Sequence, residues 1–382
     1  MKVLILGGDG FLGWPTAMHL SSCGHEVTVI DNYFRRTASA EIGAPQLYAT
    51  PKLNERVVAW AAKSGKDIKV FEGDVTDCKF FLDVFKKVVP DTVVHYAEQP
   101  SAPYSMANYE QARFTLNNNL TGTLNLAYAV REVNPECHIV KLGTMGEYGT
   151  PDIDIEEGFI DIEHKGRKGR FLFPRQAGSL YHTTKIQDTD LLYFYVRAWG
   201  LRVTDLMQGP VYGLFTDEMD DDENLFTCFS YDETFGTALN RFVVQAVAGI
   251  PLTVYGAGGQ TRGYLNIKDT MQCIRLAVDN PLDEGGLRVF NQFTETFSVN
   301  DLADRVVRAG KMLSLDVQVQ SVENPRVEAE EHYYNPALSA LPDLGLEPNL
   351  LTDDVLARIL ETVMKYKSNI HAESILPKTK WK

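Results

Sequence analysis

A glycine-rich turn near the N-terminus constrains the fold of this chain more than any other feature. The turn follows an apolar run at residues 2–6 and precedes a stretch of helical periodicity near residues 12–22. Glycines between a strand and a helix allow a tight turn and let backbone N–H groups approach a pyrophosphate closely. The positive end of the helix dipole adds to this attraction. The turn predicts a dinucleotide cradle that consists of Gly7, Gly10, Phe11, Leu12 and Gly13.

Short apolar runs alternate with helical stretches through the first half of the chain. The runs are rich in Val, Ile and Leu, as parallel strands buried on both faces are. Strands are predicted at residues 2–6, 26–30, 68–71, 92–95, 138–142 and 202–207. Helices are predicted near residues 12–22, 53–64, 78–88, 106–133 and 179–199. This alternation predicts an α/β fold with a doubly wound parallel sheet of the Rossmann type.

The pattern changes after residue 207. Helices are predicted near residues 235–249, 268–280, 299–312 and 353–368, with long loops and short strands between them. We therefore predict two domains, a cofactor-binding domain of residues 1–207 and a smaller C-terminal α/β domain of residues 208–382. Crossings of the chain between the two are expected, because the second domain reads as a cap on the first.

The composition excludes several classes of protein. A formal net charge of −14 disfavours nonspecific binding to nucleic acid or to an acidic membrane. The five cysteines form no Cys-x-x-Cys motif, so we expect a reducing cytoplasm and neither a disulfide framework nor a metal site. Apolar runs stay below the roughly 18 residues of a spanning helix. The first strand begins at Lys2, which leaves no room for a signal or transit peptide.

Further cofactor contacts are expected at the ends of the second and third strands. Asp31 ends the second strand, where a carboxylate accepts hydrogen bonds from a ribose diol and repels a 2′-phosphate, so NAD is favoured. Arg35 and Arg36 follow closely and keep NADP open. Asp74 either meets the adenine or caps the next helix. The full set predicted here is Asp31, Asn32, Arg35, Arg36, Asp74 and Val75.

A second motif supplies an acid/base pair for hydride transfer. Tyr181 and Lys185 are four residues apart, on one face of a predicted helix. A phenol is a poor base at neutral pH, but a nearby ammonium and a positive nicotinamide lower its pKa. Thr144 follows the strand at 138–142, and its hydroxyl can orient a sugar hydroxyl. His182 is either a second acid/base or a neighbour that faces the sugar.

These residues resemble the extended short-chain dehydrogenase/reductases that act on nucleotide sugars. The chain is similar in particular to the UDP-sulfoquinovose synthase family, from about residue 2 to Trp381. The matching stretches lie at residues 8–10, 98–99, 101–106, 142–149, 154–158, 235–242, 259–265 and 324–335. These long blocks are far more specific than the glycine motif.

The resemblance implies that UDP-glucose and sulfite give UDP-sulfoquinovose and water, with NAD tightly bound and recycled. A hydride leaves glucose C4 with Tyr181 as base, and the ketone acidifies the C5 proton. Loss of that proton and of the C6 hydroxyl precedes addition of sulfite at C6 and return of the hydride. A homodimer is implied, and a sulfite-donor protein stays open. The alternatives are a UDP-glucose 4-epimerase, another nucleotide-sugar epimerase or dehydratase, and a noncatalytic NAD-binding protein.

One turn departs from the pattern of the related 4,6-dehydratases, which carry Thr-Asp-Glu there. In this chain Met145 fills the Asp position and Glu147 is displaced by one residue, which disfavours a simple dehydratase. Glu147, His182 and Thr144 are all candidates for the elimination, with Glu147 slightly ahead. The alternative for Glu147 is that its carboxylate supports the turn. Met145 is expected to shape the pocket around C6.

The resemblance places UDP between the two domains. Arg262 and Arg326 are expected to bind the diphosphate, since guanidinium groups match phosphate oxygens. Thr253 and Tyr255 would meet the uracil through the backbone. The full predicted substrate set is Gln99, Ser101, Thr144, Gln208, Val211, Asn240, Arg241, Thr253, Tyr255, Gln260, Arg262, Arg326 and Glu328. Glu98 is unexpected in such a pocket and is suggested to orient sugar hydroxyls.

Overall fold

Seven parallel strands form the central sheet of the protein, which a computed structural model describes for residues 1–44, 46–326, 332–376, 378 and 381. The strand order is β12-β8-β5-β4-β1-β2-β3, and every neighbouring pair is parallel. The strands are β1 Lys2–Leu6, β2 Glu26–Asp31, β3 Ile68–Glu72, β4 Thr92–His95, β5 His138–Thr144, β8 Arg202–Gln208 and β12 Gly286–Gln292. The predicted doubly wound α/β fold is confirmed, and each predicted strand is present within two residues of its expected ends.

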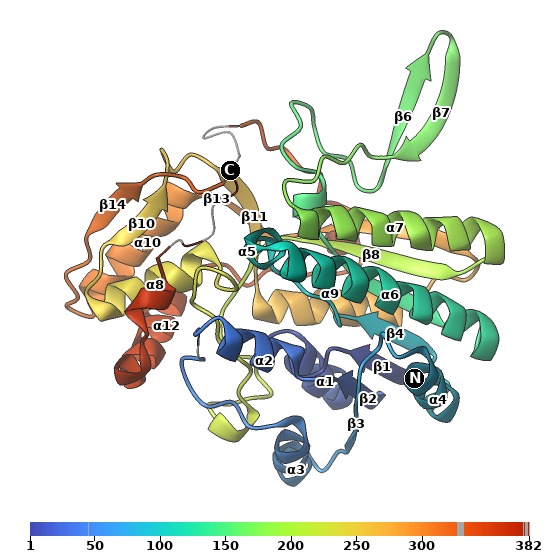
Figure 1. Cartoon of the computed structure of the whole chain (residues 1–382), viewed down its shortest axis with the longest axis horizontal. Coiled ribbons are helices and arrows are strands. Elements are labelled where there is room, and N and C mark those ends of the chain that lie inside the picture. The colour runs from blue at the N-terminus through green and yellow to red at the C-terminus, as the bar shows by residue number, and fades with distance from the viewer. Residues whose placement is uncertain (45, 327–331, 377, 379–380, 382) are drawn as a thin grey trace.

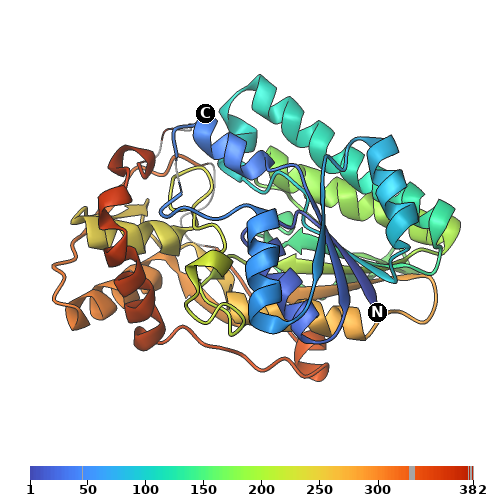
Figure 2. The same ribbon diagram turned by 90° about the horizontal axis from the view of Figure 1, so that it is seen from below.

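Helices cover both faces of this sheet (Figures 1 and 2). One face packs against α1 Gly13–Ser22, α3 Leu53–Ser64 and α9 Ile267–Asp279. The other packs against α4 Cys78–Val88, α6 Tyr109–Val133 and α7 Leu180–Trp199. The expected helix near 106–133 is two helices, because Asn108 is extended and caps α6 after the short α5 Ala102–Ala107. The helix α2 Phe34–Glu41 was not predicted.

The C-terminal half builds a second core beside the sheet, on the left of Figure 1. Its helices are α8 Ala238–Ala248, α10 Val299–Met312 and α12 Asp353–Lys365. They share this core with β10 Leu252–Tyr255, which pairs in parallel with β14 Val319–Val322. A small sheet joins β13 Glu295–Ser298, β11 Thr261–Asn266 and β9 Val211–Tyr212. The chain returns from this half to the central sheet through α9 and β12, and the boundary at residues 207 and 208 stays a prediction.

A β-hairpin stands out from the body of the molecule at the top of Figure 1. It consists of β6 Phe159–His164 and β7 Arg167–Leu172, paired antiparallel. The remaining short helices are η1 Met145–Glu147, η2 Glu223–Leu225, α11 Ala340–Asp343, η3 Lys367–Asn369 and η4 Ala372–Ser374. Within the described ranges, each helix is too short or too polar to cross a membrane.

Candidate active site

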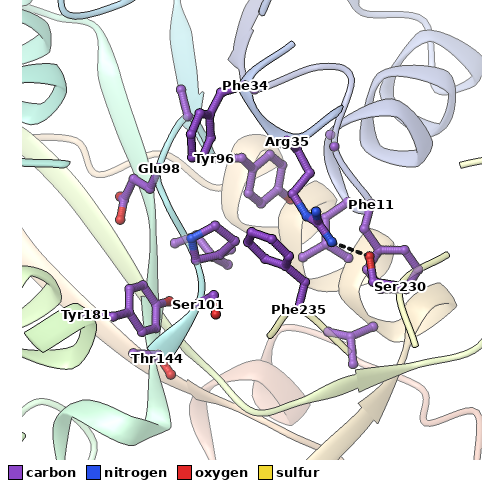
Figure 3. A pocket seen from close by; sticks show the side chains of 18 of the residues that line it. Phe11, Phe34, Arg35, Tyr96, Glu98, Ser101, Thr144, Tyr181, Ser230 and Phe235 are labelled. Atoms are coloured by element: carbon purple, nitrogen blue, oxygen red, sulfur yellow. Dashed lines mark hydrogen bonds between the residues drawn. The ribbon is translucent and has the colours of Figure 1, made fainter. Parts of the chain in front are cut away.

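A cavity of about 430 Å³ lies at the carboxyl ends of the parallel strands, the edge of an open α/β sheet where ligands bind. The strands β1, β2, β5 and β8 lead into it. Residues between 228 and 240, together with Arg326, close it from the C-terminal half. In Figure 3, Tyr181 and Thr144 lie together on one side of this cavity, and Phe11 and Ser230 lie on the other.

The structure brings most of the predicted site residues to this cavity. Its lining includes Gly7, Gly10, Phe11, Leu12, Gly13, Asp31, Asn32, Arg35, Val75, Ser101, Thr144, Tyr181, His182, Gln208, Val211, Asn240 and Arg326. Other predicted residues do not line it, namely Arg36, Asp74, Gln99, Met145, Glu147, Lys185, Arg241, Thr253, Tyr255, Gln260 and Arg262. Glu328 falls outside the described residues.

The glycine turn fits a pyrophosphate. Gly7 has a φ of +89°, and a Cβ there would lie 2.9 Å from the backbone nitrogen of Ala97. A Cβ on Gly13 would lie 2.0 Å from the carbonyl oxygen of Gly7, so α1 begins directly against the turn. The N-terminus of α1 has no side-chain cap at Leu12. A helix that starts without a cap beside a cavity leaves N–H groups for an anion.

Asp31 is placed for a ribose and the two nearby arginines are engaged elsewhere. The Asp31 carboxylate accepts hydrogen bonds from the backbone N–H groups of Asp9 (2.8 Å) and Tyr33 (2.7 Å). Burial and the neighbouring Asp9 raise the pKa of Asp31 to about 6. Arg36 forms two hydrogen bonds to Asp9, of 2.7 and 2.8 Å, and does not reach the cavity. Arg35 lines the cavity but stacks 3.4 Å over the ring of Phe235.

Of the two cofactor residues predicted after the third strand, one lines the cavity and the other does not. Val75 lines the cavity. Asp74 accepts hydrogen bonds from Thr76 and from the Asn32 amide (2.9 Å), so its carboxylate closes the local turn. The prediction that Asp74 could cap the next helix is wrong, because the cap of α4 is Asp77, whose carboxylate accepts from the N–H groups of Lys79 and Phe80.

The first turn of α7 carries Tyr181 and His182 to the cavity wall. The Ser179 hydroxyl accepts a hydrogen bond from the N–H of His182 and so begins the helix. Burial and the charges of Arg326 and Arg262 lower the pKa of His182 to about 3. Its ring lies on Gly146, where a Cβ would be 2.4 Å from Nε2. The site therefore presents a neutral imidazole beside the turn that holds Thr144.

Lys185 lies behind Tyr181 and forms an ion pair with Glu98. Both side chains are nearly fully buried, and Glu98 lines the cavity. A second carboxylate, Asp188, lies 4.0 Å from the same ammonium. Burial and the charge of Glu98 raise the pKa of the Tyr181 phenol well above its usual range.

Glu147 and Met145 point away from the cavity. Glu147 is fully buried and accepts a hydrogen bond from the N–H of Thr144 (3.2 Å). It also pairs with Arg175 (3.1 Å) and Lys141 (3.4 Å). The carboxylate that ranked first for the elimination thus faces the protein interior and supports the turn. Met145 packs in an apolar cluster and does not shape the cavity surface.

The predicted uracil and phosphate residues form a group beside the cavity. Arg241 lies 4.7 Å over the ring of Tyr255, and Gln260 donates to the carbonyl of Tyr255 (3.3 Å). Arg262 contacts His332 and the carbonyl of Thr261. Of the remaining predicted residues, Thr253 bonds to Gln245 and Gln99 bonds to Thr115 and Ser101.

Three aromatic side chains in the wall were not predicted, namely Phe34, Tyr96 and Phe235. Phe235 falls in the segment 235–242 that matched the resembling family, which was a usable signal. Phe34 and Tyr96 belong to no motif, and in the sequence they look like ordinary core side chains.

Comparisons with known proteins agree with this architecture. The NAD dependent epimerase/dehydratase family matches residues 3–291. The chloroplastic UDP-sulfoquinovose synthase of Spinacia oleracea is 51% identical over 381 residues, which cover 100% of this chain and 79% of the relative. The UDP-sulfoquinovose synthase of Sulfolobus acidocaldarius is 46% identical over 385 residues, with 100% and 98% covered. A solved UDP-glucose 4-epimerase from Bifidobacterium longum, in complex with NAD+ and UDP, shares the fold at 21% identity, with a TM-score of 0.70 over 98% of this chain and 100% of that chain.

Proposed function

The chain belongs to the NAD dependent epimerase/dehydratase family and, within it, to the UDP-sulfoquinovose synthases, and from this premise we propose that it converts UDP-glucose and sulfite to UDP-sulfoquinovose and water. The observation that carries the proposal is the identity of 51% and 46% to two enzymes of that name over the whole chain. The cavity supports it, because the proposed base, the sugar-orienting hydroxyl and the cofactor cradle all border one space.

The cradle residues fit NAD. When bound, NAD would accept a hydride from C4 and later return it, so the reaction consumes no cofactor. The backbone of the glycine turn and the start of α1 bind the pyrophosphate. Asp31 accepts the hydroxyls of the adenosine ribose. Arg36, the cation that would favour a 2′-phosphate, is held by Asp9. These contacts favour NAD over NADP.

Tyr181 and Thr144 act on the C4 hydroxyl. Tyr181 takes the proton of that hydroxyl while the hydride leaves carbon C4, and Thr144 orients the oxygen. The Lys185 ammonium stabilises the phenolate through its charge. In the closing step Tyr181 returns the proton to the C4 oxygen, so the pair ends in its starting state.

His182 is our candidate for the elimination. It lines the cavity, whereas the Glu147 carboxylate is buried behind the turn. Its imidazole would take the C5 proton and deliver it to the departing C6 hydroxyl, which leaves as water. The low pKa of His182 comes from burial and then from Arg326 and Arg262. An anionic diphosphate on these arginines would cancel part of their effect and make the imidazole a stronger base.

Sulfite then adds through its sulfur to C6 while C5 takes up the proton that bisulfite brings, and Arg326 supplies positive charge at the cavity wall. The chain as a whole carries a net charge of −14, so anions are attracted only where cations gather. Arg326 lines the cavity directly. A protein that delivers sulfite remains part of the proposal, to be compared with free sulfite in the assay.

Liquid chromatography followed by mass spectrometry of the products tests the proposal, since UDP-galactose has the same mass as UDP-glucose and must be separated from it. The purified protein is incubated with UDP-glucose, with and without sulfite, beside the Tyr181→Phe variant. A sulfite-dependent UDP-sulfohexose that the variant does not form is the expected result. UDP-galactose formed without sulfite would instead place the chain among the 4-epimerases. A protein that binds NAD and forms neither product would contradict the proposal.

Two further properties are part of the proposal, the oligomeric state and the location in the cell. A homodimer would join through α6 and α7, whose outer faces expose Leu124, Tyr128 and Phe194; exposed apolar patches of this kind mark interfaces. Light scattering at several concentrations measures the mass. A cytoplasmic location rests on the cysteine pattern alone, and fractionation of the source cells tests it.

A further inference from the structure

Glu98 is unusual in a pocket of this kind. The reaction proposed above gives this residue no role. It follows β4 and is 5% exposed, with its carboxylate on the cavity wall on the same side as Tyr181 (Figure 3). One oxygen, Oε2, pairs with the ammonium of Lys185. The other, Oε1, is buried and accepts no hydrogen bond from the described residues. Burying a carboxylate in this way costs free energy unless its charge is balanced by a nearby cation.

Among the described residues near Lys185, Glu98 is the carboxylate that best accounts for the balance of its positive charge. Asp188 also approaches the ammonium, at 4.0 Å, but burial and Glu98 raise the pKa of Asp188 to about 8. Of the two carboxylates, Glu98 makes the closer contact with the ammonium. His95 lies 3.8 Å from Oε1, and burial together with Lys185 and Lys141 lowers the pKa of His95 to about 3, so it is neutral. Glu98 is the carboxylate in direct contact, and it cancels the charge of Lys185.

We propose that Glu98 is a positioning residue that acts through Lys185: it fixes the ammonium behind Tyr181 and neutralises it, so that Tyr181 keeps its proton unless a further positive charge is present. The inference rests on the proposed function. In the oxidation step the positive nicotinamide supplies that further charge. Once the hydride has left the sugar, that charge is gone and Tyr181 stays protonated. Its hydroxyl can then donate to the C4 ketone oxygen, which polarises the ketone and acidifies the C5 proton.

The other charged and titratable groups around the pair leave this assignment intact. Lys141 is balanced by Asp205 (3.1 Å) and by Glu147 (3.4 Å). Glu147 is further paired with Arg175. The groups that face Tyr181 and Lys185 are His95 from β4, Glu98 after β4, Lys141 from β5, Glu147 from η1, and Asp188 and His182 from α7. The His182 ring lies 5.1 Å from the ring of Tyr181, and its low pKa keeps it neutral.

The pH dependence of C4 oxidation in Glu98→Gln tests the proposal. The appearance of reduced nicotinamide after UDP-glucose is added to the holoenzyme is followed across the pH range. Burial lowers and Glu98 raises the pKa of Lys185, with a raised value as the net result, and Glu98 also raises the pKa of Tyr181. Both pKa values should fall in the variant, so both limbs of the profile move to lower pH, by roughly one unit. A carboxylate that merely stabilised the fold would lower the rate without moving the limbs.

Three more variants complete the test. Glu98→Asp keeps the charge and should restore the wild-type position of both limbs. Asp188→Asn removes the more distant of the two carboxylates, which lies 4.0 Å from the ammonium, so its limbs should stay in place. Glu110→Gln, an exposed carboxylate on α6, is the matched control for the chemical change.

The outcomes separate the two proposals. An unshifted Glu98→Gln profile, or an Asp188→Asn profile that shifts in its place, overturns the role of Glu98. A wild-type protein that neither oxidises UDP-glucose nor forms product contradicts the proposed function itself. If Glu98→Gln does not fold, the Asp188→Asn profile decides between the two carboxylates: a shift of its limbs assigns the charge balance to Asp188 and overturns the role of Glu98, and unshifted limbs support Glu98.

Discussion

Replacing Lys141 by Met should destabilise the protein by about 3 kcal/mol, because it leaves one buried carboxylate without a cation. The Lys141 ammonium lies 3.1 Å from Asp205 and 3.4 Å from Glu147, and all three side chains are fully buried. Glu147 keeps its pair with Arg175 in the variant. Asp205 keeps only the Thr189 hydroxyl, at 2.6 Å, among the contacts described for it. One broken buried pair costs about 3–5 kcal/mol, and the remaining hydroxyl places the estimate at the lower end.

Urea unfolding followed by far-UV circular dichroism measures this change. The matched control is Lys69→Met, which breaks an exposed ion pair with Glu26 and should leave the midpoint unchanged. The double variant Lys141→Met with Asp205→Asn should recover most of the loss, since the uncompensated charge is removed as well. A loss below about 1 kcal/mol in Lys141→Met, or no recovery in the double variant, would refute the account of the buried network.

Three further predictions concern the site. Gly146→Ala should lower the turnover at least about tenfold with the fold retained, because its Cβ would lie 2.4 Å from Nε2 of His182 and displace the ring; steady-state rates beside a melting curve check this, and a wild-type rate would contradict it. His182→Asn should oxidise UDP-glucose but form no sulfonated product, so reduced cofactor accumulates in stopped-flow absorbance; normal product formation would exclude His182 from the elimination. The affinity for NAD should fall as the pH drops below about 6, because the raised pKa of Asp31 means that its carboxylate protonates there and loses an acceptor; calorimetry on the apoprotein measures it, and Asp31→Asn should abolish the dependence.

The sequence predicted the first six strands of the sheet, and the first five are short runs rich in Val, Ile and Leu; β8, Arg-Val-Thr-Asp-Leu-Met-Gln, was placed by its position directly after the helix that carries Tyr181. The seventh, β12, has the sequence Gly-Leu-Arg-Val-Phe-Asn-Gln, in which polar residues interrupt the run. Its partner β8 lies some 80 positions earlier in the chain, so no local signal joins the two. The helix α2 was missed for a related reason: its sequence, Phe-Arg-Arg-Thr-Ala-Ser-Ala-Glu, has a low apolar content and contains no periodic stripe.

The site shows the same division between what is local and what is not. Tyr181 and Lys185 were predicted because a helix fixes the geometry of residues four apart. The direction of Glu147 was not, since it depends on Lys141, Arg175 and Asp205, which only the folded chain brings together. Nothing in the sequence marks those three as partners.

The buried position of Glu147 is the reason we propose a different group for the elimination. The interior position is occupied by Lys141 and Arg175, which bind the carboxylate and make it part of the support for Thr144. On the cavity side, the ring of His182 lies on Gly146, where a Cβ would be 2.4 Å from Nε2. The glycine at 146 therefore leaves room for the imidazole of His182. Gly146→Ala and His182→Asn should then block the same step, and the double variant should be no slower than the more severe of the two singles.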